Sequence, residues 1–342
     1  MNTLLGLIII AIGSMGQSSS YVPINKIKEW SWENFWLTQG VFAWLVFPLL
    51  GALLANSLPE IFSIYGANGS ATFWTIFYGV LWGIGGLTFG LSMRFLGIAL
   101  GQSVALGTCA AFGTIIPAMI SGTELFSPKG LVLLLAVVVT LVGIAVVGYA
   151  GSLRSKNMTE EERKKAIKDF ALKKGLLIAL LSGVMSACFS LGLTAGTPIK
   201  EAAVANGASE LFALNPVILL VTFGGFLTNL VYCLYMNNKN KTGKEIFTSS
   251  KSVLINNLLF CTLAGLLWYS QFFGLGMGQS FFEPNSVMMA FSWSILMSLN
   301  VVFSNVWGII LKEWKGAGNK AIQYLAVGMA ILIFSLIIPN LF

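Results

Sequence analysis

Ten long apolar stretches run through this 342-residue chain and constrain its fold more than any other feature. A helix of about 20 residues crosses the roughly 30 Å hydrocarbon core of a bilayer. The stretches are continuous rather than alternating, which excludes a membrane β-barrel. We therefore predict an all-α polytopic membrane protein with ten transmembrane helices, at residues 2–22, 34–55, 70–93, 98–121, 130–150, 174–196, 212–236, 252–277, 286–310 and 321–341.

The composition agrees with this fold and excludes several kinds of chemistry. Charged residues make up 10% of the chain, against about 25% in soluble domains. The chain has no histidine, which excludes histidine-ligated zinc, Ser-His-Asp triads and histidine proton relays. The four cysteines lie in apolar runs without CxxC spacing, and no GxxxxGK[ST] loop is present to bind a nucleotide. We expect no metal and no cofactor.

The basic residues are divided unequally between the loops. Eighteen of the 20 lysines and arginines follow the first, third, fifth, seventh and ninth spans, and the other two are Lys129 and Lys200. By the positive-inside rule, the odd-numbered loops face the cytoplasm and both termini lie outside. The net charge of +7 is then explained by orientation in the membrane, and no nucleic-acid partner is expected.

The polar segment 151–173 divides the ten spans into two groups of five. Short motifs recur in both groups in the same order, including GVLW at 79–82 and GLLW at 265–268. Because each group has an odd number of helices, two similar halves must lie in opposite orientations. The sequence predicts two inverted five-helix repeats, 1–150 and 174–342, joined by a basic cytoplasmic linker. Many secondary transporters are built in this way.

Several motifs also resemble one family of transporters. Residues 26–33, KIKEWSWE, resemble the KxKxWSWE segment that follows the first helix of bacterial L-rhamnose–proton symporters. Further matches follow in order at 82–85 (WGIG), 90–97 (GLSMRFLG), 267–273 (LWYSQFF), 292–293 (SW) and 311–314 (LKEW). The resemblance covers both halves and implies the ten-helix fold of the drug/metabolite transporter superfamily. The segment 281–285, FFEPN, departs from the family pattern.

The resemblance implies a secondary active transporter that imports L-rhamnose with protons by alternating access in a bacterial inner membrane. Its partners are then L-rhamnose or a related sugar, protons and the lipid bilayer. The alternative is a carrier of the same fold with another substrate, coupled to protons or to sodium. An enzyme is not expected, and the predicted inverted repeat disfavours a passive channel.

A site for rhamnose, a neutral 6-deoxyhexose, needs hydrogen-bonding amides and an apolar wall near the middle of the membrane. The third and eighth spans are repeat partners rich in glycine, so we predict that both are interrupted at the site. The predicted substrate-binding residues are Gln17, Trp82, Gln102, Trp268, Tyr269, Gln271, Trp293 and Asn300. The alternative is structural, because amides join membrane helices and tryptophans anchor them at the interface. We assign Trp30, Trp32, Trp36 and Trp44 to such an interfacial belt.

The coupled proton requires a side chain that can be shielded from water and then reached by it. Without histidine, this side chain is expected to be a carboxylate. The first candidate is Glu33, in the first turn of the second span, and the second is Glu283, between the eighth and ninth spans. The alternative for Glu33 is that it stabilises the start of the helix, with Ser31 as the N-cap.

Overall fold

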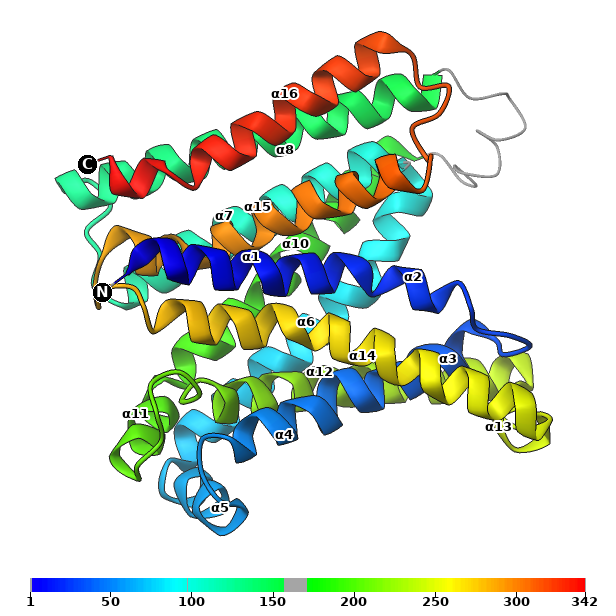
Figure 1. Ribbon diagram of the computed structural model, residues 1–342, viewed down its shortest axis with the longest axis horizontal. Helices are drawn as coiled ribbons and strands as arrows, with labels where there is room; N and C mark the ends of the chain where they lie inside the picture. The colour runs from blue at the N-terminus through cyan, green and yellow to red at the C-terminus, as the bar shows by residue number, and fades with distance from the viewer. Residues whose placement is uncertain (1, 97, 157–170, 342) are drawn as a thin grey trace. The chain divides into compact units, whose positions relative to one another are not determined.

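The computed structural model describes residues 2–96, 98–156 and 171–341, and the regular elements in these ranges are helices (Figure 1). Of the predicted linker 151–173, residues 157–170 lie outside this description. Ten helical stretches of the described residues are long and apolar enough to cross a membrane, so the prediction of a ten-span, multi-pass membrane protein is confirmed.

Most predicted spans correspond to one helix, and four are built from two or three consecutive helices. The spans are α1 (Thr3–Ser19) with α2 (Tyr21–Ile24); α3 (Trp32–Val41), η1 (Phe42–Val46) and α4 (Phe47–Leu53); α6 (Gly69–Leu96); α7 (Ile98–Ile120); α8 (Pro128–Lys156); α10 (Leu172–Ala195) with α11 (Thr197–Ala205); α12 (Asn215–Asn240); α14 (Lys251–Gln279); α15 (Val287–Ile310); and α16 (Asn319–Ser335) with η2 (Ile338–Asn340). The shorter helices α5 (Leu58–Ala67) and α13 (Glu245–Thr248) lie between spans.

Polar side chains mark where several of these helices begin. The side chain of Ser250 accepts a hydrogen bond from the Val253 N–H at the start of α14, and Ser286 caps α15 in the same way. Such caps satisfy backbone donors that the first turn leaves without a partner. The apolar runs therefore determine the length of each helix, and the polar residues between them determine where it starts.

The described residues form two compact units, each built from both halves of the sequence. Unit 1 comprises Ile84–Leu191 and Phe282–Phe342, and unit 2 comprises Asn2–Gly83 and Gly192–Phe281. Two whole spans from each half enter each unit, and α6 and α10 are each divided between the units. The compact units therefore differ from the predicted repeats, which follow one another along the chain.

In unit 2, α1 and α14 pack in opposite directions along a line of small residues. A Cβ added to Gly274 would lie 3.1 Å from the Cα of Gly13, and one added to Gly278 would lie 2.7 Å from the carbonyl oxygen of Gly6. The hydroxyl of Ser270 donates to the Gly13 carbonyl at 3.0 Å. In membranes, such small residues let two helices approach closely enough for backbone contacts.

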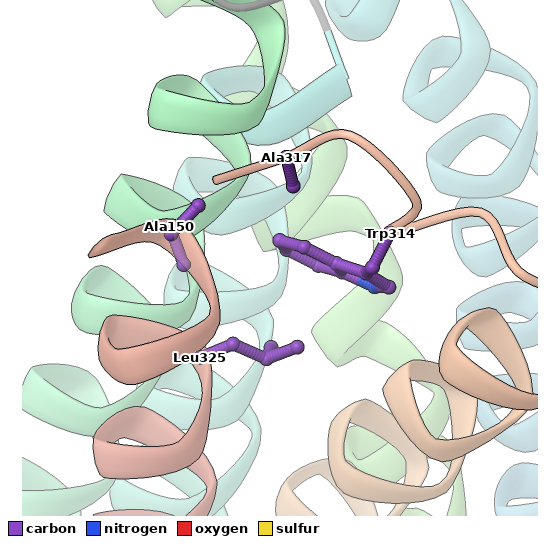
Figure 2. Close-up of a cluster of buried hydrophobic side chains, with 5 residues drawn as sticks. Ala150, Trp314, Ala317 and Leu325 are labelled. Atoms are coloured by element: carbon purple, nitrogen blue, oxygen red, sulfur yellow. The ribbon is translucent and has the colours of Figure 1, made fainter. Parts of the chain in front are cut away.

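In unit 1, α8 and α16 run side by side in opposite directions (Figure 1). Near one end of the pair, Trp314 packs among buried small and apolar side chains, with Ala150 on α8 and Leu325 on α16 (Figure 2). The guanidinium of Arg154 lies 5.4 Å from the centre of the Trp314 ring. This cluster fixes the segment that leads from α15 into α16.

The predicted interruptions in the third and eighth spans are wrong. Both α6 and α14 are continuous α-helices, and several of their glycines serve close packing instead. The irregular helix is in the second span, where η1 is a π-helix and the Phe47 N–H donates to the carbonyl of Phe42. Pro48 explains this, because it has no N–H and its ring excludes the carbonyl four residues earlier, that of Trp44.

Candidate functional site

Three indole rings pack against one another in unit 2. They belong to Trp44 on η1, Trp82 on α6 and Trp268 on α14, and we call them the tryptophan cluster. The ring centroids of Trp82 and Trp268 are 5.8 Å apart, and both rings lie about 6 Å from Trp44, at 6.2 Å and 5.9 Å. All three residues lie near the middle of their spans, the depth at which secondary transporters bind substrate.

Two glycines make room for the cluster. A Cβ added to Gly40 would lie 2.6 Å from Cε3 of Trp44, and one added to Gly225 would overlap the ring of Trp82. Trp44 is 3% exposed, whereas Trp82 and Trp268 are half-buried. The cluster therefore has a buried centre, Trp44, and two partly accessible members, Trp82 and Trp268.

Three predicted amide and phenol residues also lie in unit 2, and two of them are close to Trp268 in sequence. The Tyr269 hydroxyl donates to Oδ1 of Asn215 at 2.8 Å, and the Gln271 amide donates to the Trp268 carbonyl at 3.1 Å. Gln17, on α1, accepts a hydrogen bond from the Ser18 hydroxyl at 3.4 Å. Asn215, which is 2% exposed, was not predicted, because nothing in the local sequence connects it with Tyr269.

The other predicted binding residues lie in unit 1. The ring of Trp293 stacks on Phe189 with centroids 5.8 Å apart, and its N–H donates to the Cys109 carbonyl at 3.3 Å. Gln102 on α7 and Asn300 on α15 are half-buried. The contacts of Trp293 are those of a packing residue, which favours the structural alternative for this position.

The interfacial belt is a wrong interpretation for Trp44. A belt tryptophan lies at the end of a span with its ring toward the headgroups, but Trp44 is buried near the middle of its span. Trp30 is also buried, at 8% exposed, and its N–H donates to the Ser249 hydroxyl at 2.8 Å. The sequence did contain a signal that distinguishes Trp44 from a belt residue. Pro48 predicts a distorted helix one turn earlier, at Trp44.

A polar network surrounds Glu33 where α3 begins. The Glu33 side chain is 3% exposed, and its Oε1 accepts hydrogen bonds from the Asn240 amide at 2.9 Å and the Thr242 hydroxyl at 2.6 Å. Within the described residues it has no cationic partner. Ser31 is the N-cap residue as predicted, although its hydroxyl accepts from the Asn34 side chain rather than from the backbone.

Glu245, which the sequence did not reveal, completes this network from the start of α13, between α12 and α14. Its Oε2 accepts hydrogen bonds from the Ser31 N–H at 2.7 Å and the Asn34 amide at 2.8 Å. Burial alone raises the pKa of Glu245, but these hydrogen bonds outweigh burial and hold the pKa below its ordinary value. We call Ser31, Glu33, Asn34, Asn240, Thr242 and Glu245 the α3 cap network.

Glu283, the second candidate for the proton, lies in the turn between α14 and α15 and is exposed. An exposed carboxylate lacks the shielding from water that coupling requires. No group of three or more His, Cys, Asp or Glu residues is arranged to bind a metal ion in the part of the chain that the structure describes. The four cysteines are buried, as expected of packing residues.

Comparison with known proteins identifies the family. The family profile described as L-rhamnose-proton symport protein (RhaT) matches residues 1–341. Proteins named L-rhamnose-proton symporter from Yersinia pestis (strain Pestoides F) and Yersinia pseudotuberculosis serotype O:1b (strain IP 31758) are each 35% identical over 338 residues, which cover 97% of this chain and 96% of the relative. This is a family of transporters rather than enzymes. The chain belongs to the L-rhamnose-proton symport protein family.

Proposed function

We propose that this protein imports L-rhamnose together with protons. Membership of the symporter family gives the substrate and the coupling ion. The tryptophan cluster carries the proposal within the structure, because it places aromatic faces near the middle of three spans. Rhamnose has an apolar C–H face and a methyl group, and both favour an aromatic wall.

The binding site that we propose combines this wall with amides. The half-buried faces of Trp82 and Trp268 form the wall, and Gln17 and Gln271 supply hydrogen-bond donors and acceptors for the sugar hydroxyls. Tyr269 is a positioning residue, because its hydroxyl is already bonded to Asn215. Gln102 and Asn300, which lie in unit 1, stay predictions from the sequence.

We also propose that the two halves of the chain are inverted repeats. One pair of contacts supports this. In unit 2, Ser270 of the eighth span donates to the Gly13 carbonyl of the first span. In unit 1, Ser182 of the sixth span donates to the Gly85 carbonyl of the third span at 2.9 Å. When the repeats are aligned by their motifs, Gly13 corresponds to Ser182 and Gly85 corresponds to Ser270, each within one residue. The serine and the glycine of the contact have therefore exchanged places between the two units. Two related arrangements of this kind allow a site to open alternately to each side.

The proposed activity indicates the membrane in which the protein acts, and the charges of the loops indicate its orientation there. An importer of a sugar into a bacterial cell acts in the inner membrane. The excess of basic residues in odd-numbered loops supports a cytoplasmic position for those loops and a position outside for both termini.

Glu33 is the proposed carrier of the coupled proton. Its carboxylate is buried, and its described partners are the neutral side chains of Asn240 and Thr242. Burial shields this carboxylate from water, as the side chain that carries a coupled proton must be in part of the transport cycle. The partners lie in and after α12, so the protonation state of Glu33 affects how the start of α3 is held against that loop.

Proton movement on adding sugar tests the proposed function. Protein is reconstituted into liposomes in weakly buffered medium without sodium, and L-rhamnose is added outside. Symport predicts that the external medium becomes alkaline, because protons enter with the sugar, and that a protonophore abolishes a sustained signal. Rhamnose entry that leaves the external pH unchanged and requires sodium would favour a sodium-coupled carrier instead.

A further inference from the structure

Two buried polar atoms on the second span have no hydrogen-bond partner within the described residues. They are the indole Nε1 of Trp44 and the carboxamide Oε1 of Gln39. Both side chains are 3% exposed. Buried polar atoms are nearly always hydrogen-bonded, so each exception requires an explanation.

In other tryptophans of the protein, the indole N–H donates a hydrogen bond. The N–H groups of Trp30, Trp36 and Trp293 donate to the Ser249 hydroxyl, the Asn229 side chain and the Cys109 carbonyl, at 2.8, 3.0 and 3.3 Å. Two of these partners are side chains more than 190 residues away in sequence, so the fold supplies acceptors even over long separations. Trp44 lies among aromatic rings, which supply no comparable acceptor.

The orientation of the Trp44 ring is fixed by its neighbours. Its Cε3 and Cζ3 edge lies against Gly40, so the opposite edge, which carries the N–H, points away from that turn of α3. The rings of Trp36, Trp82 and Trp268 meet Trp44 at interplanar angles of 71°, 89° and 82°. The N–H is therefore held in place rather than free to find a partner by rotation.

Gln39 lies beside the same part of α14 as Trp44. A Cβ added to Gly265 would be 3.2 Å from the backbone carbonyl oxygen of Gln39. Trp268, whose ring contacts Trp44, lies one turn further along α14. Between Gln39 and Trp44, the helix widens into the π-helix η1. Such π-helical turns occur frequently at functional sites, because they redirect side chains.

We propose that Trp44 and Gln39 are specificity-determining residues of the sugar site, with the Trp44 N–H donating to one sugar hydroxyl and the Gln39 Oε1 accepting from another. The proposal rests on the proposed function and adds two residues to its site. It explains both unpartnered atoms, since the sugar supplies the missing hydrogen bonds. It also explains the π-helix, which holds Trp44 beside the half-buried rings of Trp82 and Trp268.

The proposal is tested by combining single-residue variants of the protein with sugars that lack single hydroxyls. Binding of labelled L-rhamnose to the purified protein in detergent is competed with 2-deoxy-, 3-deoxy- and 4-deoxy-L-rhamnose. For the wild type, one analogue that lacks the hydroxyl facing Trp44 should bind about tenfold more weakly than rhamnose. Trp44→Phe should weaken rhamnose about tenfold and leave that one analogue unaffected, because the hydrogen bond is already missing. Gln39→Met should show the same behaviour with a different analogue.

Trp36→Phe is the matched control, because it makes the same change in the same span but removes an N–H that already donates to Asn229. It should lower the melting temperature without changing the preference among the analogues. If Trp44→Phe and Gln39→Met bind rhamnose within twofold of the wild type, or weaken all analogues equally, the proposal is wrong while the transport function stands. If the wild type binds no rhamnose, the proposed function itself fails.

Discussion

The rings of Trp82 and Trp268 lie with their centroids 5.8 Å apart and their planes tilted by 38°, although the residues come from opposite halves of the sequence. Both end a Gly-x-Leu-Trp motif, GVLW in the third span and GLLW in the eighth. The fold therefore brings together equivalent positions of the two predicted repeats near the middle of their spans. This is the relationship expected of a site on the axis of an inverted repeat.

Loss of either ring should weaken sugar binding. Trp268→Ala and Trp82→Ala are expected to reduce the affinity for L-rhamnose by about tenfold to a hundredfold, since each removes part of the apolar wall. Trp268→Phe, which keeps an aromatic face, should lose less. Equilibrium binding in detergent measures this, with Trp74→Ala, an exposed position outside the cluster, as the control. Equal binding by Trp268→Ala and the wild type would remove the cluster from the site.

Packing of the cluster depends on Gly225. Gly225→Ala places a methyl group where the Trp82 ring lies, and overpacking of this kind typically costs about 1–3 kcal/mol. A lower melting temperature is expected in detergent, together with weaker rhamnose binding. Gly86→Ala, on the same helix as Trp82, is the control, because nothing lies within 4 Å of its added Cβ. A variant at Gly225 as stable as the one at Gly86 would show that the described packing is incorrect.

The α3 cap network should make stability depend on pH in acid. The pKa of Glu245 is held below its ordinary value, which is about 4.3 for glutamate. The stabilisation is therefore fully present above the ordinary pKa and is lost as the pH falls through the lower pKa of the folded protein. Melting temperatures between pH 7 and pH 3 should fall more steeply for the wild type than for Glu245→Gln. Parallel curves for the two proteins would count against the network.

Removal of the Glu33 carboxylate should separate sugar movement from proton movement. Glu33→Gln is expected to exchange labelled for unlabelled rhamnose across liposomes but to lose accumulation driven by a pH gradient. The amide keeps the size of the side chain and an acceptor for Asn240 and Thr242, so the variant should fold. Glu283→Gln serves for comparison. If that variant loses coupling while Glu33→Gln retains it, the proton is carried near Glu283 instead.

Much of the fold could be predicted because membrane spans are local features. The ten apolar runs determined the helices, since each run must satisfy its own backbone hydrogen bonds inside the bilayer. We wrongly predicted that α6 and α14 are interrupted, because glycines occur where helices pack closely as well as where helices break. At Gly274, the neighbour that explains the glycine is Gly13 on another span, and no local pattern identifies that neighbour.

Part of the site could also be predicted from local features of the sequence. Trp82 and Trp268 were found because both lie in repeated motifs in the middle of apolar runs. Trp44 was missed because a tryptophan in a group of four resembles an interfacial belt, and burial alone distinguishes the two. Glu245 was missed because its partner Ser31 is 214 residues away in sequence.

Accumulation of rhamnose in liposomes under imposed gradients tests the central claim most directly. Purified protein is reconstituted in liposomes that are one pH unit more alkaline inside, with no sodium present and the membrane potential clamped at zero. Symport of one proton with each sugar predicts that labelled L-rhamnose accumulates to about tenfold its external concentration, since one pH unit is worth about 1.4 kcal/mol. A sodium gradient without a pH gradient should produce no accumulation. Accumulation that follows the sodium gradient, or simple equilibration in both cases, would contradict proton-coupled rhamnose transport.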